Sequence, residues 1–269
     1  MNRFAITLFA AVMGSAAAAS AEDLFPDKAL EAVVRQQVFE KRGKAEPLTE
    51  ADVANISTVS SLKGSGIKSL KGLEKCPQLA LLELPDNEIA DLSPLRGLKK
   101  LQSLTLSGNK IGSIEPLGEC PALQYINLEN NQVADIGAVA NLKALNSLYL
   151  GGNKIEDLKP VENLPKLWTL SVGKNPLKNL QPIETLGWLT SLSLNETGID
   201  SLASFKLPRG VDFINLRDNK IADLGPIIEW AKSDAEGRYR QFLRLYLRGN
   251  PVPDAQREEL KSLGVRLHE

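Results

Sequence analysis

Few side chains in this sequence have the type and spacing that catalysis or metal binding requires. His268 is the single histidine and lies one residue from the end, and Cys76 and Cys120 are the two cysteines. Phosphate-binding and zinc-binding motifs need a glycine-rich loop or closely spaced ligand pairs, and the sequence contains neither pattern. We therefore expect no catalytic residue, no cofactor and no enzymatic activity.

A column of aspartates is the remaining candidate for a metal site. Asp91, Asp135, Asp157 and Asp223 recur at the same place in a repeated unit. Calcium takes about six to eight oxygen ligands, mostly from closely spaced residues, and this column lacks such clustering. Aspartate also stabilises turns through bonds from its side chain to nearby backbone groups. We predict that these aspartates are structural and that no metal is bound.

The elements that carry these residues follow a constant period. From Leu79 the unit reads Leu-x-x-Leu-x-Leu-x-x-Asn-x-Ile, and it restarts 22 residues later at Leu101 and at each equivalent position up to Val211. A period of about 20–29 residues with leucines in this order is typical of a leucine-rich-repeat solenoid. Each unit buries its apolar edge against its neighbours, which produces a long surface. The default function of such a surface is binding.

Each unit predicts one strand and one buried asparagine. The alternation x-Leu-x-Leu-x is typical of a short strand, and stacked units give a parallel sheet, so the fold class is an α/β repeat solenoid. An inward amide can bond backbone groups that a tight turn leaves unpaired, and we assign the asparagines at position nine a structural role. They are Asn87, Asn109, Asn131, Asn153, Asn175, Asn219 and Asn250.

The N-terminal segment is expected to be removed on export. Arg3 precedes a short apolar stretch, and Ala19-Ser20-Ala21 resembles a cleavage site, so residues 1–21 read as a secretory signal peptide. Loss of Arg3 changes the net charge from −1 to −2, which does not favour nucleic acid or an anionic membrane as a partner. No later segment approaches the roughly 20 apolar residues of a membrane span. We expect an exported, periplasmic or secreted monomer.

The mature chain divides into two caps and a repeat region. Residues 22–56 have helical spacing and helix-start signals and form the N-terminal cap, residues 57–253 hold about eight to nine repeats, and residues 254–269 form a short helical C-terminal cap. Terminal caps cover apolar ends that would otherwise face water. The unit that starts at Val211 is nine residues longer than the period, which predicts an insertion near 231–241.

Position in the unit also predicts the state of several individual residues. Cys76 and Cys120 share position twenty two repeats apart, so strand spacing places their Cα atoms roughly 10 Å apart, beyond the reach of a disulfide. We expect two buried free thiols. Trp230 occupies the same position and is expected in the core, and Phe242 restores the register at position one after the insertion.

Positions three, five and seven should point outward and form the concave face of the sheet. Tyr and Arg are enriched in binding hot spots, so the aromatic and basic residues among these positions, with two nearby tryptophans, are candidate ligand-binding residues. One expected cluster consists of Tyr125, Tyr149, Trp168 and Trp188, and a second consists of Phe213, Arg217, Arg244, Tyr246 and Arg248. Alternatively, the tyrosines merely cover the sheet and the arginines form a solvated face.

The unit Leu-x-x-Leu-x-Leu-x-x-Asn-x-Ile-x-Asp-Leu-x-Pro-Leu and the lead-in Leu48-Thr49-Glu50-Ala51-Asp52-Val53 resemble internalin-type bacterial leucine-rich-repeat proteins. The resemblance implies a helical N-terminal cap, a curved solenoid with a parallel concave sheet, 3₁₀-like turns on the convex side and protein recognition on the concave face. The sequence shows no immunoglobulin-like domain or wall-sorting motif after the repeats, so the resemblance implies no host-invasion role.

Two functions follow as hypotheses. The first is an exported, non-enzymatic module that binds a protein partner through its concave face. The second is a carbohydrate-binding or cell-wall-binding envelope protein, because exposed indoles such as Trp168 and Trp188 suit sugar rings. A glycan is therefore a possible ligand beside the expected protein partner.

Overall fold

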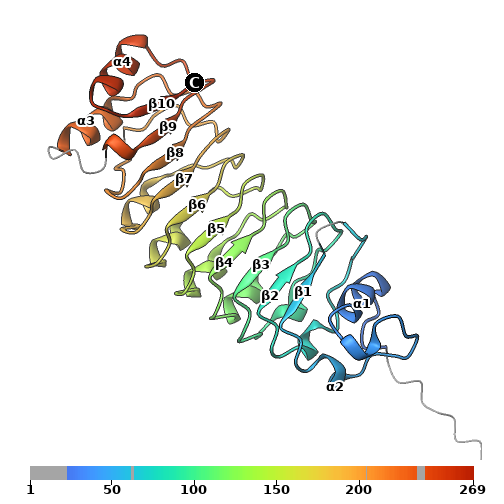
Figure 1. Cartoon of the computed structure of the whole chain (residues 1–269). Coiled ribbons are helices and arrows are strands. Elements are labelled where there is room, and N and C mark those ends of the chain that lie inside the picture. Colours follow the sequence, from blue (N-terminus) through green and yellow to red (C-terminus); the bar gives the residue numbers. More distant parts are fainter. Residues whose placement is uncertain (1–22, 62–63, 204, 235–239) are drawn as a thin grey trace, which may run out of the picture.

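The computed structural model describes residues 23–61, 64–203, 205–234 and 240–269. Within these ranges, ten parallel strands form one open sheet in chain order, with helices at both ends (Figure 1). The expected repeat solenoid is confirmed. The strands are β1 (Thr58–Ser60), β2 (Leu81–Glu83), β3 (Ser103–Thr105), β4 (Tyr125–Asn127), β5 (Ser147–Tyr149), β6 (Thr169–Ser171), β7 (Ser191–Ser193), β8 (Phe213–Asn215), β9 (Arg244–Tyr246) and β10 (Arg266–His268).

Strands β2 to β9 occupy positions three to five of their units, and neighbouring strands pair in register. Leu104 of β3, for example, lies opposite Leu82 of β2 and Ile126 of β4. From β1 to β9 the middle residue of each strand is buried. Burial of one such aliphatic side chain contributes roughly 1.5–3 kcal/mol. The constant register therefore stacks these side chains into one continuous core.

Turns of 3₁₀ helix form the opposite, convex side, as the resemblance implied. Proline occupies the first turn of several of them, where no backbone donor is needed. The aspartate column holds these turns: Asp91 accepts a hydrogen bond from the Ser93 amide at 2.8 Å. The 3₁₀ helices between strands are η2 (Leu73–Lys75), η3 (Ser93–Leu95), η4 (Glu115–Glu119), η5 (Gly137–Asn141), η6 (Lys159–Asn163), η7 (Gln181–Thr185) and η8 (Arg240–Phe242).

The position-nine asparagines bond the backbone of two consecutive units. The Asn109 amide donates to the carbonyls of Leu106 in its own unit and Leu84 in the preceding one, both at 3.0 Å. Its Oδ1 atom accepts from the Ile89 amide, also in the preceding unit, at 3.0 Å. All seven predicted asparagines are buried. Their predicted structural role is confirmed.

Thr197 stands where an asparagine is expected, and the unit before it differs as a result. Its hydroxyl is within hydrogen-bonding distance of the Leu194 carbonyl, 3.0 Å away in its own unit. In the preceding unit the Leu177 amide bonds the Asn175 carbonyl at 2.9 Å, whereas equivalent amides bond the asparagine of the next unit. The replacement of asparagine by Thr197 therefore changes the backbone hydrogen bonding of the preceding unit.

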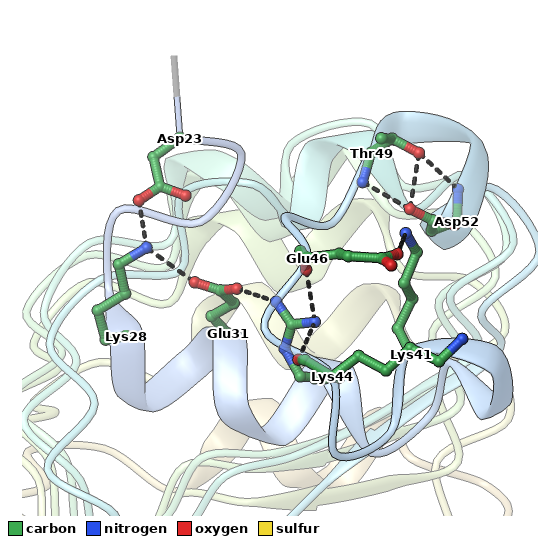
Figure 2. A network of polar contacts seen from close by, with 9 residues as sticks. Asp23, Lys28, Glu31, Lys41, Lys44, Glu46, Thr49 and Asp52 are labelled. Atoms are coloured by element: carbon green, nitrogen blue, oxygen red, sulfur yellow. Dashed lines mark hydrogen bonds and ion pairs between the residues drawn. The ribbon is translucent and has the colours of Figure 1, made fainter. Parts of the chain in front are cut away.

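Helices α1 (Lys28–Arg35) and α2 (Glu50–Val53), with η1 (Phe39–Lys41), form the N-terminal cap. Ion pairs link Lys28 to Glu31 at 2.8 Å and Lys41 to Glu46 at 2.8 Å (Figure 2). Thr49 and Asp52 form a capping box at the start of α2. The first pair and the capping box stabilise α1 and α2 individually, and the Lys41–Glu46 pair links η1 to the loop that precedes α2.

Asp27 joins this cap to the first repeat. Its Oδ1 atom caps α1 by accepting from the Ala29 and Leu30 amides at 2.9 and 3.1 Å. Its Oδ2 atom accepts from the amides of Lys68 and Ser69, which belong to the first repeat, at 2.7 and 3.0 Å. One carboxylate therefore both begins the helix and holds it against the solenoid.

The C-terminal end departs from two expectations. Helix α3 (Gly225–Ser233) replaces the 3₁₀ turn of the long unit, so Trp230 packs against the core but remains partly exposed. Phe242 is 55% exposed and Leu243 is fully buried, because the chain enters β9 from the 3₁₀ turn η8. Phe242, expected at position one, therefore does not face the core as Leu79 and Leu101 do at that position. The predicted insertion overlaps residues 235–239, which lie outside the described ranges.

Helix α4 (Asp254–Ser262) packs on α3 and closes this end of the molecule (Figure 1). The Gln256 side chain accepts from the Leu224 amide at 2.8 Å and donates to Asp223 at 2.6 Å. Lys232 of α3 pairs with Glu259 of α4 at 2.9 Å. The chain then continues into β10, which adds a strand to the sheet.

Both cysteines are buried free thiols, as predicted. Burial raises the pKa of the Cys76 thiol to about 12 and also raises that of Cys120. The Cys120 thiol lies 3.1 Å from the Leu95 carbonyl. Cys76 and Cys120 therefore act as small apolar side chains in the core.

None of the helices within the described ranges combines the length and apolar character of a membrane span. The predicted signal peptide, residues 1–21, lies outside those ranges.

Candidate functional site

The concave face consists of the outward side chains at positions three, five and seven. Residues at positions three and five are half-buried on either side of a buried central residue in β1 to β8. This pattern confirms that they line the solvent side of the sheet. Many are small and polar, including Ser147, Thr169, Ser171, Ser191 and Ser193. Two groups of larger side chains stand on either side of this stretch.

The first group is a tyrosine pair on β4 and β5. The rings of Tyr125 and Tyr149 contact each other with centroids 5.4 Å apart and an interplanar angle of 41°. Tilted aromatic pairs at this separation are favourable beyond their buried area. Partial burial raises the pKa of the Tyr125 phenol, which therefore stays a neutral hydrogen-bonding group.

The two tryptophans expected beside this pair lie where the chain enters the strands. Trp168 is 51% and Trp188 is 74% exposed. The Trp168 carbonyl accepts from the amides of Thr190 and Ser191, both at 2.9 Å, so its backbone belongs to the sheet edge. Within the described ranges neither indole makes a ring contact with the tyrosines. The expected four-residue cluster is therefore divided into a tyrosine pair and two separate exposed indoles.

The second group is denser than expected and spans β8 to β10. Phe213 and Tyr246 contact each other with centroids 5.2 Å apart. The Arg217 guanidinium lies over the Tyr246 ring at 4.5 Å, and that of Arg244 lies over Phe213 at 5.5 Å. Cation–π contacts of this kind hold a guanidinium in a fixed orientation. Four of the five predicted residues are thus joined by contacts.

His268 completes this group and was not predicted as a site residue. Its ring stacks on Tyr246 with centroids 4.3 Å apart and an interplanar angle of 9°. The sequence does contain a signal, because His268 lies one 22-residue period after Tyr246, and Arg266 one period after Arg244. The repeat therefore continues into the segment expected to be a cap. We call Phe213, Arg217, Arg244, Tyr246, Arg266 and His268 the C-terminal cluster.

Charge distinguishes this cluster from the rest of the concave face. Arg244 pairs with Asp212 at 3.5 Å. Arg248, a candidate ligand-binding residue from the sequence, pairs with Asp218 at 4.0 Å. Neither Arg217 nor Arg266 has an ion pair with a described residue. Among the described residues, four guanidinium groups and two carboxylates leave a surplus of two positive charges on this part of the sheet.

Two buried polar atoms in the cluster have no hydrogen-bond partner among the described residues. They are Nε of Arg217 and Nε2 of His268, which lie against the Tyr246 ring system. Buried polar atoms are usually paired. In the same ranges no group of three or more His, Cys, Asp or Glu side chains is placed to hold a metal ion. The chemistry available on this face is stacking, ion pairing and hydrogen bonding.

Comparison with known proteins finds a match to a repeat family over part of the chain. The family model for leucine-rich repeats in two copies matches residues 77–119, 99–143 and 121–166. A search of curated proteins gives no match. Because the matched repeats continue as one structural unit through the sheet, the fold of the chain is that of a leucine-rich-repeat solenoid.

Solved structures of internalins are similar to this chain. An internalin, InlF, from Listeria monocytogenes superimposes with a TM-score of 0.73 and 28% identity, covering 91% of this chain and 76% of that one. Internalin C2 from the same organism gives 0.64 and 28%, covering 91% and 95%. A leucine-rich-repeat protein from Leptospira interrogans, at 0.63 and 23% over 75% of this chain and 57% of its own, supports the fold. The resemblance to internalin-type repeat proteins is thus confirmed.

Proposed function

We propose that this chain is an exported, non-enzymatic module that recognises a protein partner through its concave face. The fold itself is that of a protein-interaction module. The observation that supports the specific proposal is the pair of aromatic groups on that face, Tyr125 with Tyr149 and Phe213 with Tyr246. Tyr, Trp and Arg are enriched among the few residues that carry most of the binding energy in protein interfaces.

The position of the two groups suits a partner that spans several repeats. Strands β6 and β7 lie between them and carry Ser and Thr at all four outward positions. A partner can therefore reach the sheet between the aromatic groups without meeting a large side chain. A surface of this kind favours an extended interface over a small-molecule pocket.

Partner capture with a double variant tests this function. We expect the native protein to retain a partner from envelope or secreted extracts, and Tyr149→Ala combined with Arg244→Ala to lose it while keeping the native melting temperature. Lys154→Gln, an exposed change outside the concave face, serves as the control. Equal capture by the double variant and the native protein would contradict the proposal.

Export is a separate part of the proposal and rests on the sequence of residues 1–21. Mass spectrometry of the protein recovered from the periplasm or medium should show a mature N-terminus at Glu22. A chain that keeps Met1 and stays in the cytoplasm would rule out export but not partner binding.

The carbohydrate-binding alternative gains no support from the comparisons. The exposed indoles of Trp168 and Trp188 are the residues it depends on. Retention on peptidoglycan or a glycan array that is lost in Trp168→Ala, with no protein partner captured, would favour it over the proposed function.

A further inference from the structure

We propose that the C-terminal cluster binds an acidic segment of the protein partner, with carboxylates paired to Arg217 and Arg266. This inference rests on the proposed function and names the chemistry of the segment recognised. It depends on three features of the cluster: its aromatic stack, its surplus charge and the donors that its arginines leave unpaired.

The aromatic stack fixes the orientation of one arginine. Tyr246 on β9 lies between strands β8 and β10. It contacts Arg217, two residues past the end of β8, and His268 of β10. The contact with the rings removes Nε of Arg217 from solvent. The side chain as a whole is only partly buried. The guanidinium is therefore held in place before any partner arrives, which lowers the entropy cost of binding.

The donors of that guanidinium have no acceptor within the described ranges. No hydrogen bond from the Arg217 side chain to a described residue is present, and Arg266 is exposed without an ion pair. A guanidinium presents parallel N–H groups that match the two oxygens of a carboxylate. Asp and Glu side chains are the groups in a protein partner that satisfy this geometry.

The surrounding charges favour the same ligand. Asp212 and Asp218 balance Arg244 and Arg248, and Glu196 is paired with Lys174 at 3.4 Å. No described carboxylate thus balances the positive charge of Arg217 and Arg266, and the other outward residues of this face are mostly neutral. Phe213 and Tyr246 offer apolar surface beside it. An acidic segment that also carries an aromatic or aliphatic side chain complements both features.

Short fluorescent peptides test this proposal with the full mature chain. One set carries Asp and Glu with interspersed aromatic residues, and the matched set replaces them with Asn and Gln. We expect the acidic set to bind, the amide set to bind at least about tenfold more weakly, and added salt to weaken the acidic set alone. Equal binding of both sets, or no binding of the acidic set, would overturn the inference.

Single arginine variants test whether the acidic peptides bind at the C-terminal cluster. Arg217→Gln and, separately, Arg266→Gln should weaken the acidic peptides by about tenfold, while Lys154→Gln, with the same loss of charge elsewhere, should have no effect. Unchanged affinity in both arginine variants would contradict the assignment. If only Tyr149→Ala abolished peptide binding, the assignment of the acidic segment to the C-terminal cluster would be contradicted. Recognition of a partner through the concave face would still be supported.

An anionic polysaccharide is the other class of ligand that two free arginines could attract. Polygalacturonate serves as the probe for this class. We expect it to bind more weakly than the acidic peptides. Equal or tighter binding with the same dependence on Arg217 would replace the inferred protein segment with a polysaccharide.

Discussion

Asn153 shows at residue scale how a polar side chain stabilises an apolar interior. It donates to the carbonyls of Leu128 and Leu150, both at 2.9 Å, and accepts from the Val133 amide at 2.9 Å. Two of these three groups belong to the preceding unit. Removal of the side chain would leave buried backbone groups in both units without partners, which is more costly than the loss of an exposed bond.

We therefore predict that Asn153→Ala lowers the free energy of unfolding by about 2–3 kcal/mol, measured by urea denaturation. Asn146→Ala is the matched control, because Asn146 is half-buried and its side chain has no hydrogen bond to a described residue. The control should change stability by less than about 0.5 kcal/mol. Similar losses in the two variants would contradict the structural role of Asn153.

The cysteines make a second prediction at this scale. Because burial raises both thiol pKa values, the thiols stay protonated and shielded near neutral pH. A maleimide should label neither Cys76 nor Cys120 in the folded protein, and both after unfolding without a reductant, as peptide mapping would show. Failure of both to label after unfolding would indicate a disulfide.

At the scale of elements, the attachment of the N-terminal cap depends on Asp27. Burial raises the pKa of this carboxyl, but hydrogen bonds from four backbone amides outweigh that effect and lower it. We predict that Asp27→Ala destabilises the protein by about 1–3 kcal/mol. Asp23→Ala is the control, since Asp23 is exposed and pairs only with Lys28 among the described residues.

The sign of the pH dependence follows from the lowered pKa of Asp27. The stabilisation is present above the unfolded value of 3.8 and is lost as the pH falls through the lower folded value. The difference in unfolding free energy between the native protein and Asp27→Ala should therefore shrink in that acidic window. A difference that stays constant there would mean that the charge of Asp27 is not involved.

The sequence predicts the elements well where the period is regular. It predicts the strands, the buried asparagines and the first turn of α2, because each can be assigned from residue types at fixed spacings in the sequence. It fails at Phe242 and Trp230, where an extra turn of helix changes which side chain faces inward. The contacts of Tyr246 with Arg217 and His268 also join three units. Repeat position alone does not predict how such long side chains pack together.

At the scale of the whole molecule, stability should vary along the solenoid. Central units are covered on both sides, whereas terminal units depend on caps. We predict that the Leu128 amide, bonded to Tyr149 at 2.9 Å, exchanges its hydrogen at least about tenfold more slowly than the Leu247 amide, bonded to His268 at 3.1 Å. Hydrogen exchange by NMR measures both rates. Equal rates would indicate that the solenoid opens as a single unit.

The hydrogen bonds of the position-nine asparagines also have a direction along the chain. Asn109 satisfies backbone groups of the unit that precedes it, and the same holds for Asn153 and Asn219. During synthesis each newly made unit therefore lacks the side chain that completes it until the next asparagine emerges, 22 residues later in regular units. A growing chain should consequently carry one unit that lacks these hydrogen bonds at its most recently synthesised end. Folding should therefore lag behind translation by one repeat.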